Sequence, residues 1–253
     1  MTIPAEVATI VSLVPSLTEA IASCDASLLA GATRYCSHPP GLAAERVGGT
    51  KNPDVPRIIE LKPDVVLANE EENRAPDLAA LRAAGISVWV TKIRTLPEAL
   101  GSLDRMLTIA CRLPGPAWLD AAAAAWAQVA GEEAEQAAQV APARPRRAIV
   151  PIWRRPWMVL GSDTFAGDLL ARLGVANVYA THEERYPRVD LADLRASGAD
   201  LVVLPDEPYR FSADDGPEAF PRIPAALVSG RHLTWYGPSL AEAPDVLSRQ
   251  LRG

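Results

Sequence analysis

The chain has 253 residues, of which 49% are hydrophobic and 22% are charged, and its formal net charge is −6. This balance allows a packed core and excludes a disordered chain. The acidic net charge disfavours a nucleic-acid or anionic-membrane surface, so we expect no nucleic-acid partner. Cys24, Cys36 and Cys111 show no close pairing, which indicates free thiols rather than a disulfide framework or a CxxC site.

The first element is an apolar, β-branched run at residues 8–14 that ends at Pro15 and is typical of a buried strand. The letters S-L-T-E follow, and Ser16 with Glu19 would form a capping box for a helix that continues to about residue 23. A strand, a tight turn and a helix within so short a stretch predict the start of a doubly wound sheet.

The same alternation continues through the first third of the chain. A helix with proline in its first turn is predicted at 53–61, a strand at 64–68, a polar loop at 69–74, a helix at 77–84 before Gly85, and a strand at 87–91. Continuous apolar strands that alternate with helices predict a parallel sheet covered on both faces.

The middle of the chain lacks strand signals and predicts two helices, at 97–111 and 116–138, followed by a stiff connector at 141–147. Alternation then resumes, with strands at 148–153, 200–204 and 225–229, and with helices at 164–173, 191–196 and 238–251. The segments 63–71 and 199–207 also resemble each other: each has an Asp, an apolar strand and an acidic loop. We therefore predict an α/β fold of two Rossmann-like lobes, with an N-terminal lobe at 1–96, a helical backbone at 97–140 and a C-terminal lobe at 141–253.

Ligands of open parallel sheets bind beyond the carboxyl ends of the strands. Six rings gather at these predicted ends although aromatic residues make up only 6% of the chain: Tyr35, Trp153, Trp157, Tyr209, Trp235 and Tyr236. Rings with polar tips and a few neighbouring charges suit a pocket for a flat organic ligand. The alternative is that the rings only cover the ends of the sheets.

Three other groups of residues could carry chemistry. Glu70, Glu71 and Glu72 could ligate a hard cation, although such a run more often forms a solvated loop. His38, His182 and His232 lie in three separate loops and could converge on a metal, with surface or capping roles as the alternative. Cys36 with His38 is too short a constellation to predict a nucleophile–base pair, and the sequence contains no GxSxG, HExxH, P-loop or GxGxxG motif.

Several motifs carry a family resemblance. I-V-S-L-V-P-S-L-T-E-A, T-R-Y-C-S-H-P-P at 33–40, V-G-G-T-K-N-P-D and L-K-P-D-V-V-L-A-N resemble the first lobe of the cobalamin/iron-siderophore-type ABC solute-binding proteins, also called helical-backbone metal receptors. D-T-F-A-G-D-L-L-A-R-L-G-V-A-N-V, R-Y-P-R-V-D-L-A-D-L and A-D-L-V-V-L-P-D-E-P resemble the second lobe. The resemblance is closest to the cobalamin-binding branch. It implies two lobes joined by a long backbone helix, the class III periplasmic-binding-protein architecture, with cobalamin, haem or a ferric chelate gripped between the lobes.

The resemblance also bears on individual positions. It places Tyr35 among the aromatic residues that line the cleft, and Asn69 and Glu70 where the cobalamin branch often has a tryptophan and small residues, which makes this wall acidic. The glutamates with which exported members dock onto an ABC permease correspond to Ala75 and Ala192, with Asp77 and Asp193 close by. These departures suggest a receptor uncoupled from import. The resemblance implies an extracytoplasmic location, whereas Met1 as the native start would imply a cytoplasmic one.

The leading interpretation is a non-enzymatic protein that holds a corrinoid, tetrapyrrole or metal chelate in the interlobe cleft, with cobalamin or a related chelate as the candidate ligand. The predicted ligand-binding residues are Ser16, Leu17, Arg34, Tyr35, Asn69, Glu70, Trp153, Arg154, Trp157, Glu207, Tyr209, Trp235 and Tyr236. Arg34, Arg154 and Arg155 would meet carboxylates or phosphates of the ligand. One alternative is an enzyme with Glu70 or Glu207 as the general base and Tyr35 or Tyr209 as the proton donor. Another is a direct metal-ion carrier that uses His and Glu side chains.

Overall fold

The computed structural model describes residues 3–139 and 144–252, and the chain divides into two compact units. Unit 1 comprises Met1–Ile93, Pro97–Asp120 and Tyr236–Pro238; unit 2 comprises Arg94–Leu96, Ala121–Trp235 and Ser239–Gly253. The first residues of the predicted connector, 141–143, lie outside the described residues. The domain boundaries inferred from the sequence stay a prediction.

Unit 1 is built on a five-stranded sheet with the order β3-β2-β1-β4-β5. The strands are β1 (Ile10–Ser12), β2 (Leu29–Ala32), β3 (Glu45–Arg46), β4 (Val65–Asn69) and β5 (Val88–Thr91). All pairings in this sheet are parallel, with Ile10 of β1 opposite Leu29 on one side and Val65 on the other. Because β1 and β4 are buried along their whole length, both faces of the sheet need helical cover.

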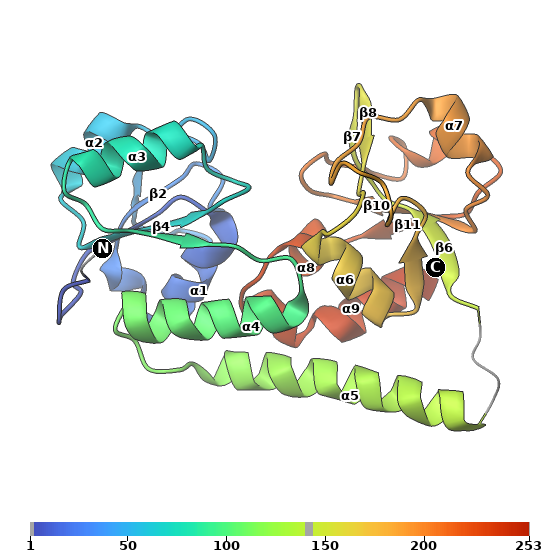
Figure 1. Cartoon of the computed structure of the whole chain (residues 1–253), viewed down its shortest axis with the longest axis horizontal. Helices are drawn as coiled ribbons and strands as arrows, with labels where there is room; N and C mark the ends of the chain where they lie inside the picture. The colour runs from blue at the N-terminus through green and yellow to red at the C-terminus, as the bar shows by residue number, and fades with distance from the viewer. Residues whose placement is uncertain (1–2, 140–143, 253) are drawn as a thin grey trace. The chain divides into compact units, whose positions relative to one another are not determined.

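Helices cover the two faces of this sheet (Figure 1), as the alternating sequence pattern predicts. The helices are α1 (Pro15–Asp25), α2 (Val55–Leu61), α3 (Ala75–Ala83) and α4 (Leu96–Arg105). In Figure 1, α2 and α3 lie on one face, and α1 and α4 lie on the other. The core under α2 and α3 combines Val11, Leu13 and Val66 of the sheet side with Ile58 and Leu81 of the helices.

The predicted capping box at the start of α1 is wrong. The N-cap residue is Val14, which makes no side-chain capping hydrogen bond, and Pro15 occupies the first turn. Proline suits this position because its fixed φ is already helical and it has no N–H to leave unpaired. Ser16 therefore lies inside the helix rather than at its cap. The side chain of Asp54 does cap α2, where it accepts a hydrogen bond from the Arg57 amide, and the proline in the first turn of α2 is Pro56.

The strandless middle of the chain is helical, as predicted. α4 continues into a π-helical turn, Met106–Ala110, and α5 follows as Ala117–Gln139. No helix among the residues that the structure describes is both long and apolar enough to cross a membrane.

Unit 2 contains a four-stranded parallel sheet with the order β11-β10-β6-β9 and a separate antiparallel pair, β7-β8. The strands are β6 (Arg146–Ile149), β7 (Pro151–Arg154), β8 (Trp157–Val159), β9 (Val175–Asn177), β10 (Leu201–Pro205) and β11 (Ala225–Val228). The helices are α6 (Phe165–Arg172), α7 (Leu191–Ala196), α8 (Gly230–Thr234) and α9 (Ala243–Arg252). Within this unit α6, α8 and α9 lie on one side of the four-stranded sheet, and the β7-β8 hairpin and α7 lie on the other (Figure 1).

The strand predicted at 148–153 is in fact two strands, which is a correction with consequences for the site. β6 ends at Ile149 and β7 begins at Pro151. Proline has no N–H to donate to a central ladder, so the chain leaves the four-stranded sheet here. It forms instead a hairpin with β8 that places Trp153 opposite Met158 and Arg154 opposite Trp157.

Candidate functional site

The carboxyl end of β4 in unit 1 is fixed by two buried asparagines. Asn69 donates from Nδ2 to Thr91 Oγ1 at 3.1 Å and accepts from the Glu71 amide at 2.9 Å. Asn73 Oδ1 accepts from the Asn69 amide at 2.9 Å. Asn69 is only 2% exposed, so its side chain positions the loop that follows β4 and is engaged inside the protein rather than displayed.

Tyr35 is a predicted site residue that unit 1 displays openly. Its ring is 55% exposed, and the Arg34 guanidinium carbon lies 5.2 Å from the ring centroid. The backbone around this ring is held by Arg46, which donates from Nη1 to the carbonyl oxygens of Thr33 and Cys36 at 3.0 Å each. Unit 1 therefore presents a cation–π pair on an anchored loop.

Other predicted site residues of unit 1 are less accessible. Ser16 is 3% exposed and Leu17 is fully buried, and their part in ligand binding stays a prediction. Tyr236, which belongs to unit 1, is 8% exposed. Glu70, in contrast, is exposed, and its Oε2 lies 3.9 Å from Lys92 Nζ. Burial raises the pKa of the neighbouring Glu72.

The β7-β8 hairpin in unit 2 carries two tryptophans with opposite environments. Trp153 is 41% exposed, and Tyr209 packs edge-on against it with ring centroids 5.5 Å apart. Trp157 is partly buried, stacked on Phe211 at 6.2 Å and edge-on to Phe220 at 5.4 Å. Hence Trp153 has open ring surface for a ligand, whereas Trp157 belongs largely to the packing of the unit.

Arg154 is held in place by a charged network. Its guanidinium forms ion pairs with Asp215 and Glu218 and lies over the ring of Trp157, 5.6 Å from the centroid. The Tyr209 hydroxyl donates to Asp215 Oδ2 at 2.6 Å. With two carboxylates already bound, Arg154 has less capacity for an anionic ligand than its sequence position suggests, and it fixes the hairpin against the loop at 209–218.

An open hollow of about 660 Å³ lies beside the hairpin within unit 2. Its lining includes the aromatic side chains Trp157 and Tyr179 and the charged residues Arg154, Arg155, His182, Arg188, Asp190 and Asp193. The pKa of Tyr179 is raised by burial and, to a smaller extent, by the negative charge of Asp193. Of the predicted residues, Arg154 and Trp157 meet here, together with Arg155.

Glu207 and Trp235 are paired with each other. The Trp235 Nε1–H donates to Glu207 Oε2 at 2.9 Å, and Trp235 is only 7% exposed. The Tyr209 hydroxyl, in contrast, donates to Asp215. The base-and-donor pair that the enzymatic alternative required from Glu207 and Tyr209 is therefore engaged in other contacts.

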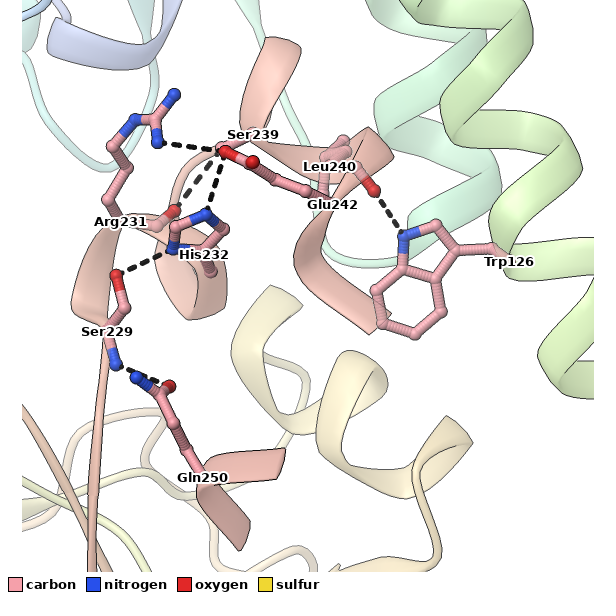
Figure 2. Close-up of polar contacts among 8 residues, drawn as sticks. All are labelled: Trp126, Ser229, Arg231, His232, Ser239, Leu240, Glu242 and Gln250. Atoms are coloured by element: carbon pink, nitrogen blue, oxygen red, sulfur yellow. Dashed lines mark hydrogen bonds and ion pairs between the residues drawn. The ribbon is translucent and has the colours of Figure 1, made fainter. Parts of the chain in front are cut away.

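A polar network that sequence reasoning missed anchors the segments on both sides of Trp235 (Figure 2). His232 Nδ1 lies 2.7 Å from Ser229 Oγ, and His232 Nε2 lies 3.0 Å from Glu242 Oε1. Arg231 also pairs with Glu242, at 3.4 Å. This pairing lowers the pKa of Glu242, with the His232 hydrogen bond as the largest cause. Two further bonds, from Ser229 to Gln250 and from Trp126 to Leu240, tie the network to α9 and α5.

The histidines do not form a metal site. His232 is bound in the network just described, and His182 accepts a hydrogen bond from the Glu184 amide at 3.0 Å. His38 Nδ1 lies 3.1 Å from Ser37 Oγ. Within residues 3–139 and 144–252, no group of three or more His, Cys, Asp or Glu side chains is arranged to hold a metal ion.

Comparisons with known proteins give a consistent result. The model of the family described as "Periplasmic binding protein" matches residues 10–224. The vitamin B12-binding protein of Vibrio cholerae serotype O1 is 27% identical over 184 residues. The match covers 72% of this chain and 64% of that relative, so it spans less than two thirds of the relative's length.

Two solved structures share the fold. The crystal structure of the periplasmic vitamin B12 binding protein BtuF of Vibrio cholerae gives a TM-score of 0.75 at 21% identity, covering 97% of each chain. The periplasmic heme-binding protein BhuT in complex with two hemes gives 0.77 at 21% identity, covering 96% of this chain and 97% of that one. The predicted architecture, two Rossmann-like lobes with a long backbone helix, is confirmed.

Proposed function

The chain belongs to the periplasmic binding protein family, and we propose that the ligand it holds is a flat metal-containing macrocycle, either a corrinoid or a tetrapyrrole, or a related metal chelate. Members of this family bind small molecules as solute receptors, and this chain is a solute-binding protein rather than an enzyme. The position of the ligand in an interlobe cleft, which the resemblance implies, stays a prediction.

The exposed ring of Trp153 is the observation that carries the proposal. A tryptophan that is 41% exposed, with Tyr209 packed against it in a T-shaped contact, offers a large apolar surface on a supported hairpin. Flat π-systems stack on such surfaces, and the contact is stabilised by burial of apolar area. In unit 1 the exposed ring of Tyr35 supplies a second surface of the same kind.

The names of the similar proteins support this class of ligand. One relative is named for vitamin B12, and one solved structure contains two hemes. Both ligands are flat rings around a metal. Asn69 occupies the position where the cobalamin branch often has tryptophan, and its amide is engaged with Thr91. We therefore base the ligand class on the exposed rings and not on this position.

Titration of the purified protein tests the proposal. Cyanocobalamin and haemin would each be added and followed by visible absorption and isothermal calorimetry. We expect saturable binding of at least one, weakened in Trp153→Ala and largely retained in Trp153→Phe, which keeps a ring. Absence of binding by the unmodified protein, or equal affinity in all three proteins, would contradict the proposal. Stoichiometric zinc or iron binding without an organic ligand would favour the metal-ion carrier instead.

We also propose that this receptor is uncoupled from ABC import. Ala75 and Ala192 are exposed in the first turns of α3 and α7, where the resemblance places the docking glutamates. Loss of exposed charges removes electrostatic steering and register at little cost in fold stability. Asp77 and Asp193 lie within two residues, so the test compares the unmodified chain with Ala75→Glu/Ala192→Glu in a pull-down with a cobalamin-type permease. Retention of the unmodified chain would overturn the proposal.

A further inference from the structure

The β7-β8 hairpin is extended by a third short segment of chain, residues 187–189. The Val159 amide donates to the Pro187 carbonyl at 3.1 Å, and the Val189 amide donates to the Trp157 carbonyl at 3.2 Å. Met158 and Arg188 therefore face each other as an antiparallel bridge. Met158 is at the same time the partner of Trp153 in the hairpin.

This register puts three side chains in one row. Directly opposite residues of antiparallel strands project to the same face, with neighbouring Cβ atoms about 4.5–5.5 Å apart. Trp153, Met158 and Arg188 thus follow one another across a single face, a row we call the Trp–Met–Arg row. Arg154 and Trp157 are opposite each other and project to the other face, which packs on Phe211 and Phe220.

Each member of the row offers a different interaction. Trp153 provides an exposed ring, supported by a T-shaped contact with Tyr209. Met158 is partly exposed and carries a polarisable thioether, which adapts to apolar and aromatic surfaces. Arg188 is exposed and ends the row with a fixed positive charge and a planar fork of donors that matches a carboxylate.

The two arginines of this region differ in their partners. Arg154 is neutralised by Asp215 and Glu218. Arg188 has no ion pair with any acid among residues 3–139 and 144–252, although Asp190 and Asp193 line the same hollow. An exposed guanidinium without a carboxylate partner, placed beside an apolar row, is available to bind an anion.

We propose that the Trp–Met–Arg row selects a flat macrocycle that carries ionised peripheral carboxylates. The ring would lie over Trp153 and Met158, and a carboxylate would accept hydrogen bonds from Arg188. This inference rests on the proposed function and narrows it, because it favours anionic tetrapyrroles over corrinoids whose side chains are neutral amides.

The test uses two probes with the same ring and different charge, zinc(II) deuteroporphyrin and its dimethyl ester. Binding is followed by the shift of the Soret band in the unmodified protein, in Arg188→Ala and in Arg222→Ala, which removes another exposed arginine of unit 2. We expect Arg188→Ala to weaken the diacid about tenfold or more, as for the loss of a charge-assisted hydrogen bond, and to leave the diester unchanged. Arg222→Ala should change neither affinity.

The outcomes distinguish a failure of the selectivity inference from a failure of the proposed function. Equal weakening of diacid and diester by Arg188→Ala, or no effect on either, would overturn the role of Arg188. Cyanocobalamin is titrated in parallel. If it binds tightly and the diacid does not, the selectivity inference fails while the proposed function stands. If none of the three probes binds the unmodified protein, both fail.

Discussion

The two units present their aromatic rings in different ways. In unit 1 the ring of Tyr35 lies on a loop whose backbone is held by Arg46, while the neighbouring loop after β4 is fixed by the buried amides of Asn69 and Asn73. In unit 2 the ring of Trp153 lies on a hairpin, and ion pairs of Arg154 and aromatic packing of Trp157 hold that hairpin. In unit 1, side chains hold the loops by hydrogen bonds to backbone atoms. In unit 2, strand pairing and the ion pairs of Arg154 hold the hairpin.

This difference locates selectivity mainly in unit 2. The loop anchored by the asparagine amides carries Glu70, Glu71 and Glu72 in a turn rather than in a strand. A hairpin, in contrast, aligns side chains at fixed spacing, so that ring, thioether and guanidinium occur in a defined order across one face. The variants below test whether each unit depends on its own kind of support.

Gly161→Ala should have the largest effect, because it breaks the third segment of the hairpin. A Cβ at Gly161 would come 2.0 Å from the Glu184 carbonyl oxygen and 2.9 Å from Pro187 Cδ. The backbone at 184–188 would have to move, and overpacking against backbone costs about 3 kcal/mol. Urea unfolding measures the loss.

Gly131→Ala is the matched control for this variant. Gly131 lies in α5, and apart from the backbone of its own helix no atom of the residues that the structure describes comes within 4 Å of the added Cβ, so the change should stabilise the protein by up to about 1 kcal/mol. If Gly161→Ala unfolds at the same urea concentration as the unmodified protein, residues 184 and 187 do not lie as close to Gly161 as described.

Trp157→Ala and Trp153→Ala should separate the two faces of the hairpin. Trp157 packs on Phe211 and Phe220 and is partly buried, so its removal should cost about 2 kcal/mol, below the value for a fully buried tryptophan. Trp153 is 41% exposed, and its removal should change stability by less than about 1 kcal/mol while weakening ligand binding. Thermal unfolding and ligand titration on both variants give the comparison. A reversed order of stabilities would mean that the faces are misassigned.

The sequence predicts the repeating architecture well because it depends on local pattern. The helix expected at 191–196 is α7, and the apolar runs of the two similar segments are β4 and β10, both buried along their whole length. The resemblance supplied the family and the long backbone helix. These features are encoded in hydrophobic periodicity and in motifs that need no tertiary contact to be recognised.

The site was less predictable because it depends on register and burial. Pro151 is a local signal that a central strand ends, but nothing local shows that the chain continues as a hairpin with β8, or that Arg188 pairs with Met158 thirty residues earlier. The motif R-Y-P-R at 185–188 is part of the resemblance, but the resemblance does not identify its second arginine, Arg188, as a site residue. Conversely, Leu17 was expected in the site from its position after β1, and it is fully buried.

Asn73→Ala tests the support used in unit 1. The Asn73 Nδ2 donates to the Thr50 carbonyl at 2.9 Å and to the Leu13 carbonyl at 3.3 Å, and its Oδ1 accepts from the Asn69 amide. Alanine leaves buried backbone groups without these partners, which should cost about 1.5 kcal/mol. Asn52→Ala, an exposed change in the same unit, is the control and should stay within about 0.5 kcal/mol of the unmodified protein in urea unfolding. If both variants are equally stable, the hydrogen bonds of Asn73 do not stabilise unit 1.

The smallest effect is expected at Glu242, whose contribution should depend on pH. Hydrogen bonds and ion pairs from His232 and Arg231 lower the pKa of Glu242 in the folded protein (Figure 2). A carboxylate with a lowered folded pKa stabilises the fold above its unfolded pKa of about 4.3, and this stabilisation is lost as the pH falls through the folded value. Because the side chain is 58% exposed, solvent screening limits the contribution to less than about 1 kcal/mol.

Glu242→Gln should therefore lower the free energy of unfolding near pH 6, and the difference from the unmodified protein should shrink as the solution is acidified below about pH 4. Glu183→Gln, which removes the same charge from an exposed position, should show no such convergence. Urea unfolding at a series of pH values measures both differences. A Glu242→Gln difference that grows on acidification has the wrong sign for a carboxylate stabilised in its charged form. It would mean that the network beside Trp235 is held by His232 and Ser229 rather than by Glu242.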